Sequence, residues 1–324
     1  MTDIAMIEAA AARAKGTVRR TPLLSSPFLD EIAGRPVFAK AEVLQHTGSF
    51  KFRGAWSALS ALGPGTRARG VLAYSSGNHA QGVARAAALH GVPATIIMPR
   101  DAPALKIANT RGLGAEVILY DRAGGENREA LGETLRTARD LTLIKPFDDP
   151  FVIAGQGTCG LEIAEQAAEA DIHEATVLTC CGGGGLTAGI ALALAARAPG
   201  LRVAPVEPEG FDDTARSQKA GTRTPHDSPE TGLCDAVLTR MPGPLTFPVI
   251  GRLCAPAIVV TDTETKAAMR AAFDRLKLVL EPGGAIALAA ALFHGDALPP
   301  GPVICTLSGG NVDRAPFAQI LHGP

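Results

Sequence analysis

Apolar runs of strand length alternate with helix-length segments along most of this 324-residue chain. Between residues 70 and 145 the runs VLAYSS, ATIIMP, AEVILY and LTLIK are separated by segments with helical spacing. This alternation predicts a parallel sheet whose strands are joined by crossover helices. The helices are expected over 80–90, 104–111 and 126–139.

The same alternation resumes after Pro146 and predicts a second parallel sheet. Strands are expected at ATVLTC, LRVAPVE, AIVV and PVICTL, with an earlier strand-like run at Val37–Val43. Because the chain is longer than one compact core usually supports, we expect an α/β protein of two lobes, each a parallel-rich sheet flanked by helices. The expected helices of the second sheet cover 158–169, 186–197, 264–276 and 285–293. The expected large lobe comprises residues 1–65 and 148–324, and the small inserted lobe comprises residues 66–147.

Composition and charge exclude several classes of partner. The chain is 46% hydrophobic, and 31 basic residues balance 32 acidic ones. It has no basic run with interleaved aromatic residues, so we expect no nucleic-acid partner. The longest apolar runs, such as residues 190–196, are too short to cross a bilayer, and the first 16 residues read as a helix without a signal-peptide core. We therefore expect no membrane partner.

Cysteine usage points to the cytoplasm. The six cysteines show no CxxC spacing and no histidine at metal-ligand spacing, so we expect buried, reduced thiols. They are Cys159, Cys180, Cys181, Cys234, Cys254 and Cys305.

The segment TGSFKFRGA, Thr47–Ala55, carries the first candidate for chemistry. It places Lys51 between two phenylalanines and behind a Gly-Ser turn. An amine that is partly removed from water has a lowered pKa and acts as a nucleophile. The pattern is also typical of an ordinary helix start, with Ser49 as the N-cap and Lys51 in water. The choice between these readings depends on the rest of the chain.

Two loops that follow predicted strands have the composition of anion sites. In SSGNHAQG, Ser75, Ser76, Asn78 and the amides of the next helix would face a carboxylate, although a plain turn capped by Asn78 fits as well. The role of His79 in that loop is open.

Four consecutive glycines, Gly182–Gly185, have no packing value, and they indicate amides that wrap a phosphate at a helix start. This run is neither GxGxxG nor GxxxxGK[ST], which argues against a dinucleotide or a nucleoside triphosphate.

Two further loops lie after later strands. The acids of EPEGFDD, residues 207–213, would bind a hard divalent ion together with a backbone carbonyl, but the residues alone favour a solvated loop that caps the next helix. The glycines of LSGGN allow close approach of a ring, and Ser308 adds one hydroxyl, although the segment is also an ordinary turn. One cofactor would use these loops together, because it has a phosphate for the glycines, an aldehyde for Lys51 and a ring nitrogen for Ser308. That cofactor is pyridoxal phosphate.

Seven segments, in order along nearly the whole chain, resemble one family. They are SFKFRGA, SSGNHAQG, IAGQGT, CGGGGL, EPEGFDD, EPGGA and LSGGNVD. The family is that of the serine/threonine dehydratases and serine racemases, fold-type II pyridoxal phosphate enzymes with a tryptophan synthase β-like fold. The resemblance implies that Lys51 binds the cofactor aldehyde, that Phe50 packs on the ring and that Asn78 bonds the ring hydroxyl. The other implied contacts are Gly182, Gly183, Gly184 and Gly185 to the phosphate, Glu281 beside the ring, Ser308 at the ring nitrogen, Ser75, Ser76, Gly77 and His79 around the substrate carboxylate, and Glu207, the Phe211 carbonyl and Asp213 around a divalent cation.

The implied reaction is a β-elimination on L-threonine, L-serine or a related 3-hydroxy amino acid. The substrate amine would displace Lys51, the freed lysine would remove the α proton, and the products would be a 2-oxo acid and ammonia. Ser308 carries no charge to stabilise a protonated ring nitrogen, which suits elimination better than transamination. Ser76 matches the second proton donor of the racemases, so serine or aspartate-type racemisation stays an alternative, as does 3-hydroxyaspartate dehydration.

Some positions depart from the family pattern. Ala236 replaces a glycine in TGLCDAV, and Lys145 stands where some relatives carry histidine, before the segment FDD. These changes leave the substrate side chain open. A homodimer is the family expectation, and regulation through an appended C-terminal domain after His322 is not expected. A β-replacement enzyme of the cysteine-synthase kind and a non-catalytic phosphate-binding module are the rival hypotheses.

Overall fold

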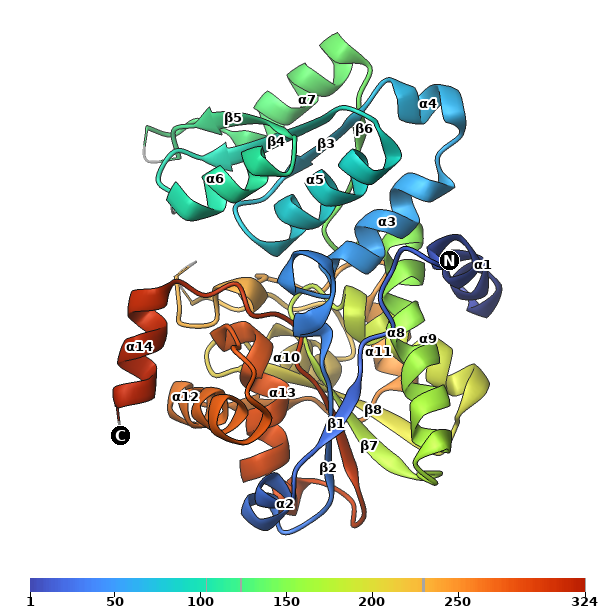
Figure 1. Ribbon diagram of the computed structural model, residues 1–324, viewed down its shortest axis with the longest axis vertical. Coiled ribbons are helices and arrows are strands. Elements are labelled where there is room, and N and C mark those ends of the chain that lie inside the picture. The colour runs from blue at the N-terminus through green and yellow to red at the C-terminus, as the bar shows by residue number, and fades with distance from the viewer. Residues whose placement is uncertain (103, 123, 229–230, 324) are drawn as a thin grey trace.

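The protein has two α/β lobes, shown in Figure 1. This computed structural model describes residues 1–102, 104–122, 124–228 and 231–323. In that part of the chain a six-stranded sheet has the order β1-β2-β10-β7-β8-β9, and a four-stranded sheet has the order β5-β4-β3-β6. All neighbouring strands are parallel except β1 and β2. The expected fold of two parallel-rich sheets with flanking helices is confirmed.

The six-stranded sheet contains strands from both ends of the chain. Its strands are β1 (Leu23–Ser25), β2 (Val37–Lys40), β7 (Ala175–Cys180), β8 (Leu201–Pro208), β9 (Ile258–Val260) and β10 (Val303–Thr306). The helices of this lobe are α1 (Ile4–Ala14), α2 (Pro27–Ala33), α3 (Lys51–Ala61), α8 (Pro150–Glu169), α9 (Gly185–Arg197), α10 (Asp213–Ala220), α11 (Phe247–Leu253), α12 (Asp262–Ala271), α13 (Pro282–Phe293) and α14 (Arg314–His322).

The four-stranded sheet lies in the upper lobe of Figure 1. Its strands are β3 (Val71–Tyr74), β4 (Ala94–Pro99), β5 (Glu116–Tyr120) and β6 (Thr142–Leu143), and its helices are α4 (Pro64–Ala68), α5 (Asn78–His90), α6 (Ala104–Gly112) and α7 (Arg128–Arg139). All four strands fall within residues 66–147, and the strands of the larger sheet fall outside that range. The lobe boundaries themselves stay a prediction.

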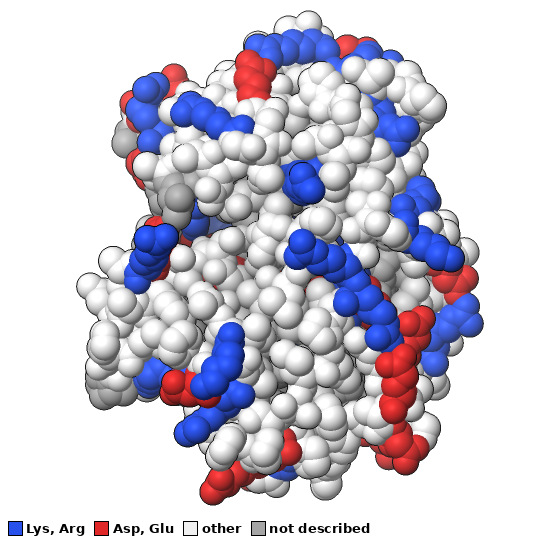
Figure 2. All heavy atoms as spheres, in the orientation of Figure 1, with Lys and Arg blue, Asp and Glu red and all other residues white. Residues whose placement is uncertain are grey.

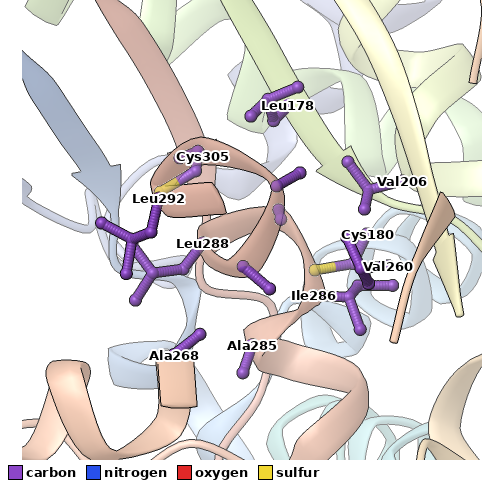
Figure 3. Close-up of a cluster of buried hydrophobic side chains, with 14 of the residues drawn as sticks. Leu178, Cys180, Val206, Val260, Ala268, Ala285, Ile286, Leu288, Leu292 and Cys305 are labelled. Carbon is purple, nitrogen blue, oxygen red and sulfur yellow. The ribbon is translucent and has the colours of Figure 1, made fainter. Parts of the chain in front are cut away.

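Helix α13 forms the centre of the large lobe. Its residues from Pro282 to Leu292 are all buried, and most of them are alanine or glycine. Small side chains let the helix lie close to the sheet, where Ile286 and Leu288 pack with residues of the neighbouring strands and of α12 (Figure 3). The segment EPGGA that begins this helix is thereby held rigidly next to the ends of β7 and β10.

Helix α8 begins earlier than its apolar pattern predicts. We expected a helix over 158–169, but α8 starts at Pro150, because the Asp149 carboxylate accepts hydrogen bonds from the first amides of the helix. The glycines of IAGQGTCG hide this helix in the sequence. They are required by packing, since a Cβ on Gly155 would lie 2.5 Å from the Arg53 carbonyl oxygen of α3.

A buried ion cluster fixes α3 against α8. The Arg53 guanidinium, 2% exposed, donates to both oxygens of Glu42 at 2.7 and 2.8 Å and to both oxygens of Glu162 at 2.7 and 2.8 Å. Lys40 donates to Glu162 at 2.6 Å. Burial alone would raise the pKa of Glu42, but the Arg53 charge lowers it below its ordinary value. Lys51 is the first residue of α3, two positions before Arg53, so the cluster holds the start of the helix that carries Lys51.

All six cysteines are free; the predicted burial is confirmed for five of them, whereas Cys254 is partly exposed. Within the described ranges, no helix combines the length and the apolar content needed to cross a membrane. On the face drawn in Figure 2, lysine and arginine side chains are interspersed with acidic ones around a largely uncharged surface.

Candidate active site

Lys51 lies between the two lobes with its amine partly out of water. Its Nζ donates to the Pro146 carbonyl oxygen at 3.0 Å and lies 5.1 Å from the centre of the Phe50 ring. Burial lowers the pKa of Lys51 to about 8, and the negative charge of Glu281 opposes that shift. An appreciable fraction of neutral, nucleophilic amine is therefore present near neutral pH.

The simple helix-start reading of this segment is half right. Lys51 does begin a helix, but the N-cap residue is Phe50, which makes no side-chain cap, and Ser49 is not the cap. Ser49 is fully buried, and its backbone pairs with Gly309 of the loop after β10. The Phe50 amide donates to the Ser308 carbonyl oxygen at 3.0 Å. The lysine segment is thus fixed to the serine loop, although the two are far apart in sequence.

The glycine run lies at the start of α9, where close neighbours leave no room for side chains. Gly184 has φ of 86°, and a Cβ there would lie 2.9 Å from the Thr246 hydroxyl. A Cβ on Gly183 would overlap the Phe147 ring. Within the part of the chain that the structure describes, the amides of Gly182–Gly185 donate to no protein acceptor. Free amides at the start of α9 are what a phosphate group needs.

Asn78 and Glu281 meet across the lobes. Asn78 Nδ2 donates to Glu281 Oε1 at 2.5 Å. Burial and the nearby charge of Asp235 raise the pKa of Glu281 to about 7, while Asn78 and the cations Lys106 and Lys51 lower it. Next to this pair, a Cβ on Gly309 would overlap Glu281 Oε1. Only glycine fits there, because the Glu281 carboxylate occupies the space that a side chain would need.

Ser308 occupies the base of the site. It is 4% exposed, its amide donates to the Gly284 carbonyl oxygen at 3.2 Å, and its hydroxyl contacts the buried Cys180 thiol. Cys180 and Cys181 are fully surrounded, and burial raises the pKa of both thiols. Buried thiols with raised pKa values pack in the core and do not act as nucleophiles.

The loop Ser75–Gly77 lies at the start of α5. The Ser75 hydroxyl accepts from the Gly77 amide at 3.2 Å, and Ser76 is half-buried with no partner for its hydroxyl among the described residues. His79 is buried and bonds the Ile144 carbonyl oxygen through Nε2 at 2.9 Å. Burial and the charge of Lys51 lower the pKa of His79 to about 3, so its ring is neutral. It offers a carboxylate no charge, and its part in substrate binding stays a prediction.

The comparisons with known proteins settle the family. The chain matches the family described as Pyridoxal-phosphate dependent enzyme over residues 14–309. The protein belongs to this family. It is 43% identical over 319 residues to an L-threo-3-hydroxyaspartate ammonia-lyase of Pseudomonas sp, which covers 97% of each chain. The structure of maize serine racemase superimposes with a TM-score of 0.91 at 39% identity, covering 98% of this chain and 96% of that one. The structure of the T.th. threonine deaminase superimposes with a TM-score of 0.90 at 44% sequence identity, covering 96% of this chain and 99% of that one.

These findings confirm the resemblance stated from the motifs, and the family's cofactor fits the residues present. The free amides of Gly182–Gly185 and the partly dry Lys51 amine match its phosphate and its aldehyde. The similarity to an ammonia-lyase and to a serine racemase argues for elimination or racemisation and against the cysteine-synthase alternative.

Sequence reasoning missed contacts that do not show as motifs. Phe147 covers the glycine run, and Asp148 accepts from the Leu245 amide at 2.8 Å. Lys145, in contrast, is exposed. Asp235, beside the departure at Ala236, pairs with Lys106 of the small lobe at 3.2 Å. Apart from the FDD segment and the Ala236 substitution, the sequence carries no signal for these contacts.

The acidic loop brings two of its predicted ligands together. Glu207 is fully buried and accepts from the amides of Thr214 and Ala215 at 2.8 and 2.9 Å. Asp213 is also fully buried, and neither of its carboxylate oxygens has a partner among the described residues. Burial and the Glu207 charge raise the pKa of Asp213 to about 8. Glu207 therefore caps the start of α10, as the alternative interpretation expected, but neither it nor Asp213 is solvated. In the described ranges, no group of three or more His, Cys, Asp or Glu side chains is placed to hold a metal.

Proposed function

We propose that this protein is a pyridoxal-phosphate-dependent ammonia-lyase that eliminates the hydroxyl of a 3-hydroxy amino acid. The observation that carries the proposal is the Lys51 amine, with its pKa lowered to about 8, in one site with the free amides of the glycine run. When bound, pyridoxal phosphate supplies an aldehyde that holds the substrate amine and a ring that withdraws electrons from the α carbon.

The side chains of this site would carry the proton transfers. Lys51 Nζ would accept the α proton, and the bond between the β carbon and its hydroxyl oxygen would break. The hydroxyl takes one proton and leaves as water. Water is consumed again when ammonia is released, so the net products are a 2-oxo acid and ammonia. Ser308, as a neutral partner of the ring, favours this elimination over transamination.

The amides at the start of α5 and the hydroxyls of Ser75 and Ser76 would bind the α-carboxylate. An anion is favoured there by the unpaired amides and by the helix dipole. Because the His79 ring is neutral, these groups and not an imidazolium would supply the attraction. Asn78 and Glu281 would border the ring, and Phe50 would pack on it.

Among substrates, L-threo-3-hydroxyaspartate has the best support, and L-threonine and L-serine come next. The support is the 43% identity to the Pseudomonas hydroxyaspartate ammonia-lyase over 97% of each chain, set beside 44% identity to a threonine deaminase. The test is to measure 2-oxo acid and ammonia release from L-threonine, L-serine, D-serine and the 3-hydroxyaspartate isomers. Release of pyruvate or 2-oxobutyrate alone would move the assignment to a serine/threonine dehydratase. Cysteine formation from O-acetylserine and sulfide without 2-oxo acid would refute elimination.

Racemisation is the second candidate, favoured by the free hydroxyl of Ser76. A racemase needs a proton donor on the ring face opposite Lys51, and the resemblance assigns that role to Ser76. Chiral analysis of leftover serine tests it. Ser76→Ala should abolish any racemisation and retain elimination, whereas scrambled chirality in that variant would remove Ser76 from the role.

We also propose a divalent cation, a homodimer and a cytoplasmic location. The unpartnered oxygens of Asp213 beside Glu207 support a cation that the Phe211 carbonyl also contacts, because two buried carboxylates need a proton or a cation to offset their charge. Isothermal titration with Mg²⁺, Ca²⁺ and Mn²⁺ tests this site.

Six free cysteines support a reducing compartment, and light scattering of the purified protein tests the dimer.

A further inference from the structure

The side-chain amide of Asn78 joins the two lobes. Asn78 belongs to α5 of the small lobe and is 9% exposed. Its Nδ2 donates to Glu281 Oε1 at 2.5 Å, and its Oδ1 accepts from Asn311 Nδ2 at 2.7 Å. Glu281 precedes α13 and Asn311 follows β10, so both partners belong to the large lobe. Both ends of one amide are therefore held by the opposite lobe.

The orientation of that amide is set by a backbone atom. Asn311 Nδ2 also donates to the Thr47 carbonyl oxygen at 2.7 Å. A carbonyl only accepts, so Asn311 must turn its nitrogen toward Thr47, and that same nitrogen faces Asn78. Asn78 must then present its oxygen to Asn311 and its nitrogen to Glu281. The direction of each hydrogen bond follows from the one before it.

The carbonyl that starts this chain of hydrogen bonds is itself held in place. Thr47 has φ of 60°, a left-handed conformation that few residues other than glycine adopt. Gly48 follows with φ of 72°, and a Cβ on Gly48 would lie 3.0 Å from Asn311 Oδ1. The Gly310 amide donates to the Gly48 carbonyl oxygen at 3.0 Å. The turn before Lys51 and the loop after Ser308 therefore form one unit around the Asn311 side chain.

We propose that Asn311 is a positioning residue that fixes the Asn78 amide with Nδ2 toward Glu281 and toward the cofactor ring. The inference rests on the cofactor site of the proposed function. Asn78 Nδ2 carries two N–H groups, and Glu281 takes one of them. The second remains for the ring hydroxyl. Asn311 contacts Asn78 and not the ring, so its effect on the cofactor passes through that amide.

Removing the Asn311 donor frees the Asn78 amide to turn over. The turned amide would set its oxygen against the Glu281 carboxylate, where two acceptors repel each other, and would withdraw the donor from the ring. Asn311→Asp goes further, because it places a carboxylate against the Thr47 carbonyl and Asn78 Oδ1. Neither change requires the backbone to move, so the fold is expected to persist.

The test compares the holoenzyme with Asn311→Asp, Asn311→Ala and the control Asn109→Asp. Asn109 is exposed on α6 and undergoes the same change of charge. Affinity for pyridoxal phosphate, the visible absorbance maximum of the bound cofactor and the melting temperature are measured. Both Asn311 variants are expected to bind the cofactor about tenfold more weakly, as the loss of one or two hydrogen bonds implies, and to shift the absorbance maximum. Asn109→Asp should match the wild type.

A double variant separates positioning from general packing. If Asn311 acts through Asn78, then Asn78→Ala with Asn311→Ala should bind the cofactor no more weakly than Asn78→Ala alone. Additive losses overturn the proposal, and so does a lower melting temperature with cofactor affinity and absorbance unchanged. A wild-type protein that binds no pyridoxal phosphate overturns the cofactor site and this inference together. Normal wild-type binding with an unaffected Asn311→Asp overturns the inference alone.

Discussion

Replacing Lys51 by methionine is expected to stabilise the cofactor-free protein at pH 7 while removing its activity. The pKa of Lys51 is lowered from 10.5 to about 8, because burial disfavours the charged amine. Folding at pH 7 therefore carries a protonated amine into a partly dry site. That lowering corresponds to at most about 3 kcal/mol of unfolding free energy. Methionine keeps a similar apolar stem and has no charge to desolvate.

The net gain is smaller than that limit. Lys51 is partly exposed, so solvent reduces the electrostatic cost. The variant also loses the hydrogen bond to the Pro146 carbonyl oxygen, which contributes about 1 kcal/mol. We expect Lys51→Met to raise the free energy of unfolding by about 1 kcal/mol, or roughly 2 °C in Tm. Lys51→Ala should likewise abolish elimination while the protein stays folded.

The gain has a defined pH dependence. Below pH 8 the amine is protonated in both the folded and the unfolded state, and the wild type bears the full cost of burying the charged amine. Between pH 8 and 10.5 the Lys51 amine is protonated in the unfolded chain but neutral in the folded protein. The free energy of unfolding of the wild type therefore rises with pH, and the advantage of Lys51→Met shrinks. Urea denaturation of both proteins at pH 7 and pH 10 measures this, with the exposed Lys15→Met as control. Equal stabilities at pH 7, or a difference that does not shrink by pH 10, would refute the reasoning.

Gly183→Ala is expected to weaken pyridoxal phosphate binding by about tenfold or more, because the added Cβ would overlap the Phe147 ring. Equilibrium dialysis measures this loss, and wild-type affinity would contradict the close packing. Arg53→Met should lower the free energy of unfolding by about 3 kcal/mol, since Glu42 would stay buried without its paired guanidinium, whereas Glu162 keeps its ion pair with Lys40. A loss below about 1 kcal/mol in urea denaturation would show that Arg53 does not carry that charge balance. Chelation should lower the Tm of the wild type and leave Asp213→Asn unaffected, whereas an unchanged melting curve and rate in the wild type would rule out the cation site.

The strands were the most predictable part of the fold. A strand covered on both faces by helices appears in sequence as a short continuous apolar run, and the predicted ATVLTC and ATIIMP are β7 and β4 residue for residue. Helix α8 was not predictable in full, because its glycines satisfy close packing against α3 and α9 and not local helix preference. The Asp149 cap set its start and was the signal that marked it in the chain.

The residues of the candidate site also fall into those that the sequence predicts and those that it does not. Lys51, Gly182–Gly185 and Ser308 were found because each lies in a motif whose composition has a chemical reason. Asn311 also lies in a motif, but nothing local indicates its role, since its function depends on an amide 233 positions away in the sequence. Periodicity and local composition do not encode which way such an amide points. That information arises only when the loops after β3 and β10 meet.

The segment 144–149 explains why this meeting place is the site. It is the return crossing from the smaller sheet to α8, and its residues face the chemistry on both sides. Two of its carbonyls accept from His79 and Lys51, and the ring of Phe147 covers Gly183. The acceptor of the lysine amine and the side chain that covers Gly183 therefore belong to the same short segment, so one stretch of chain borders both the lysine and the glycine run.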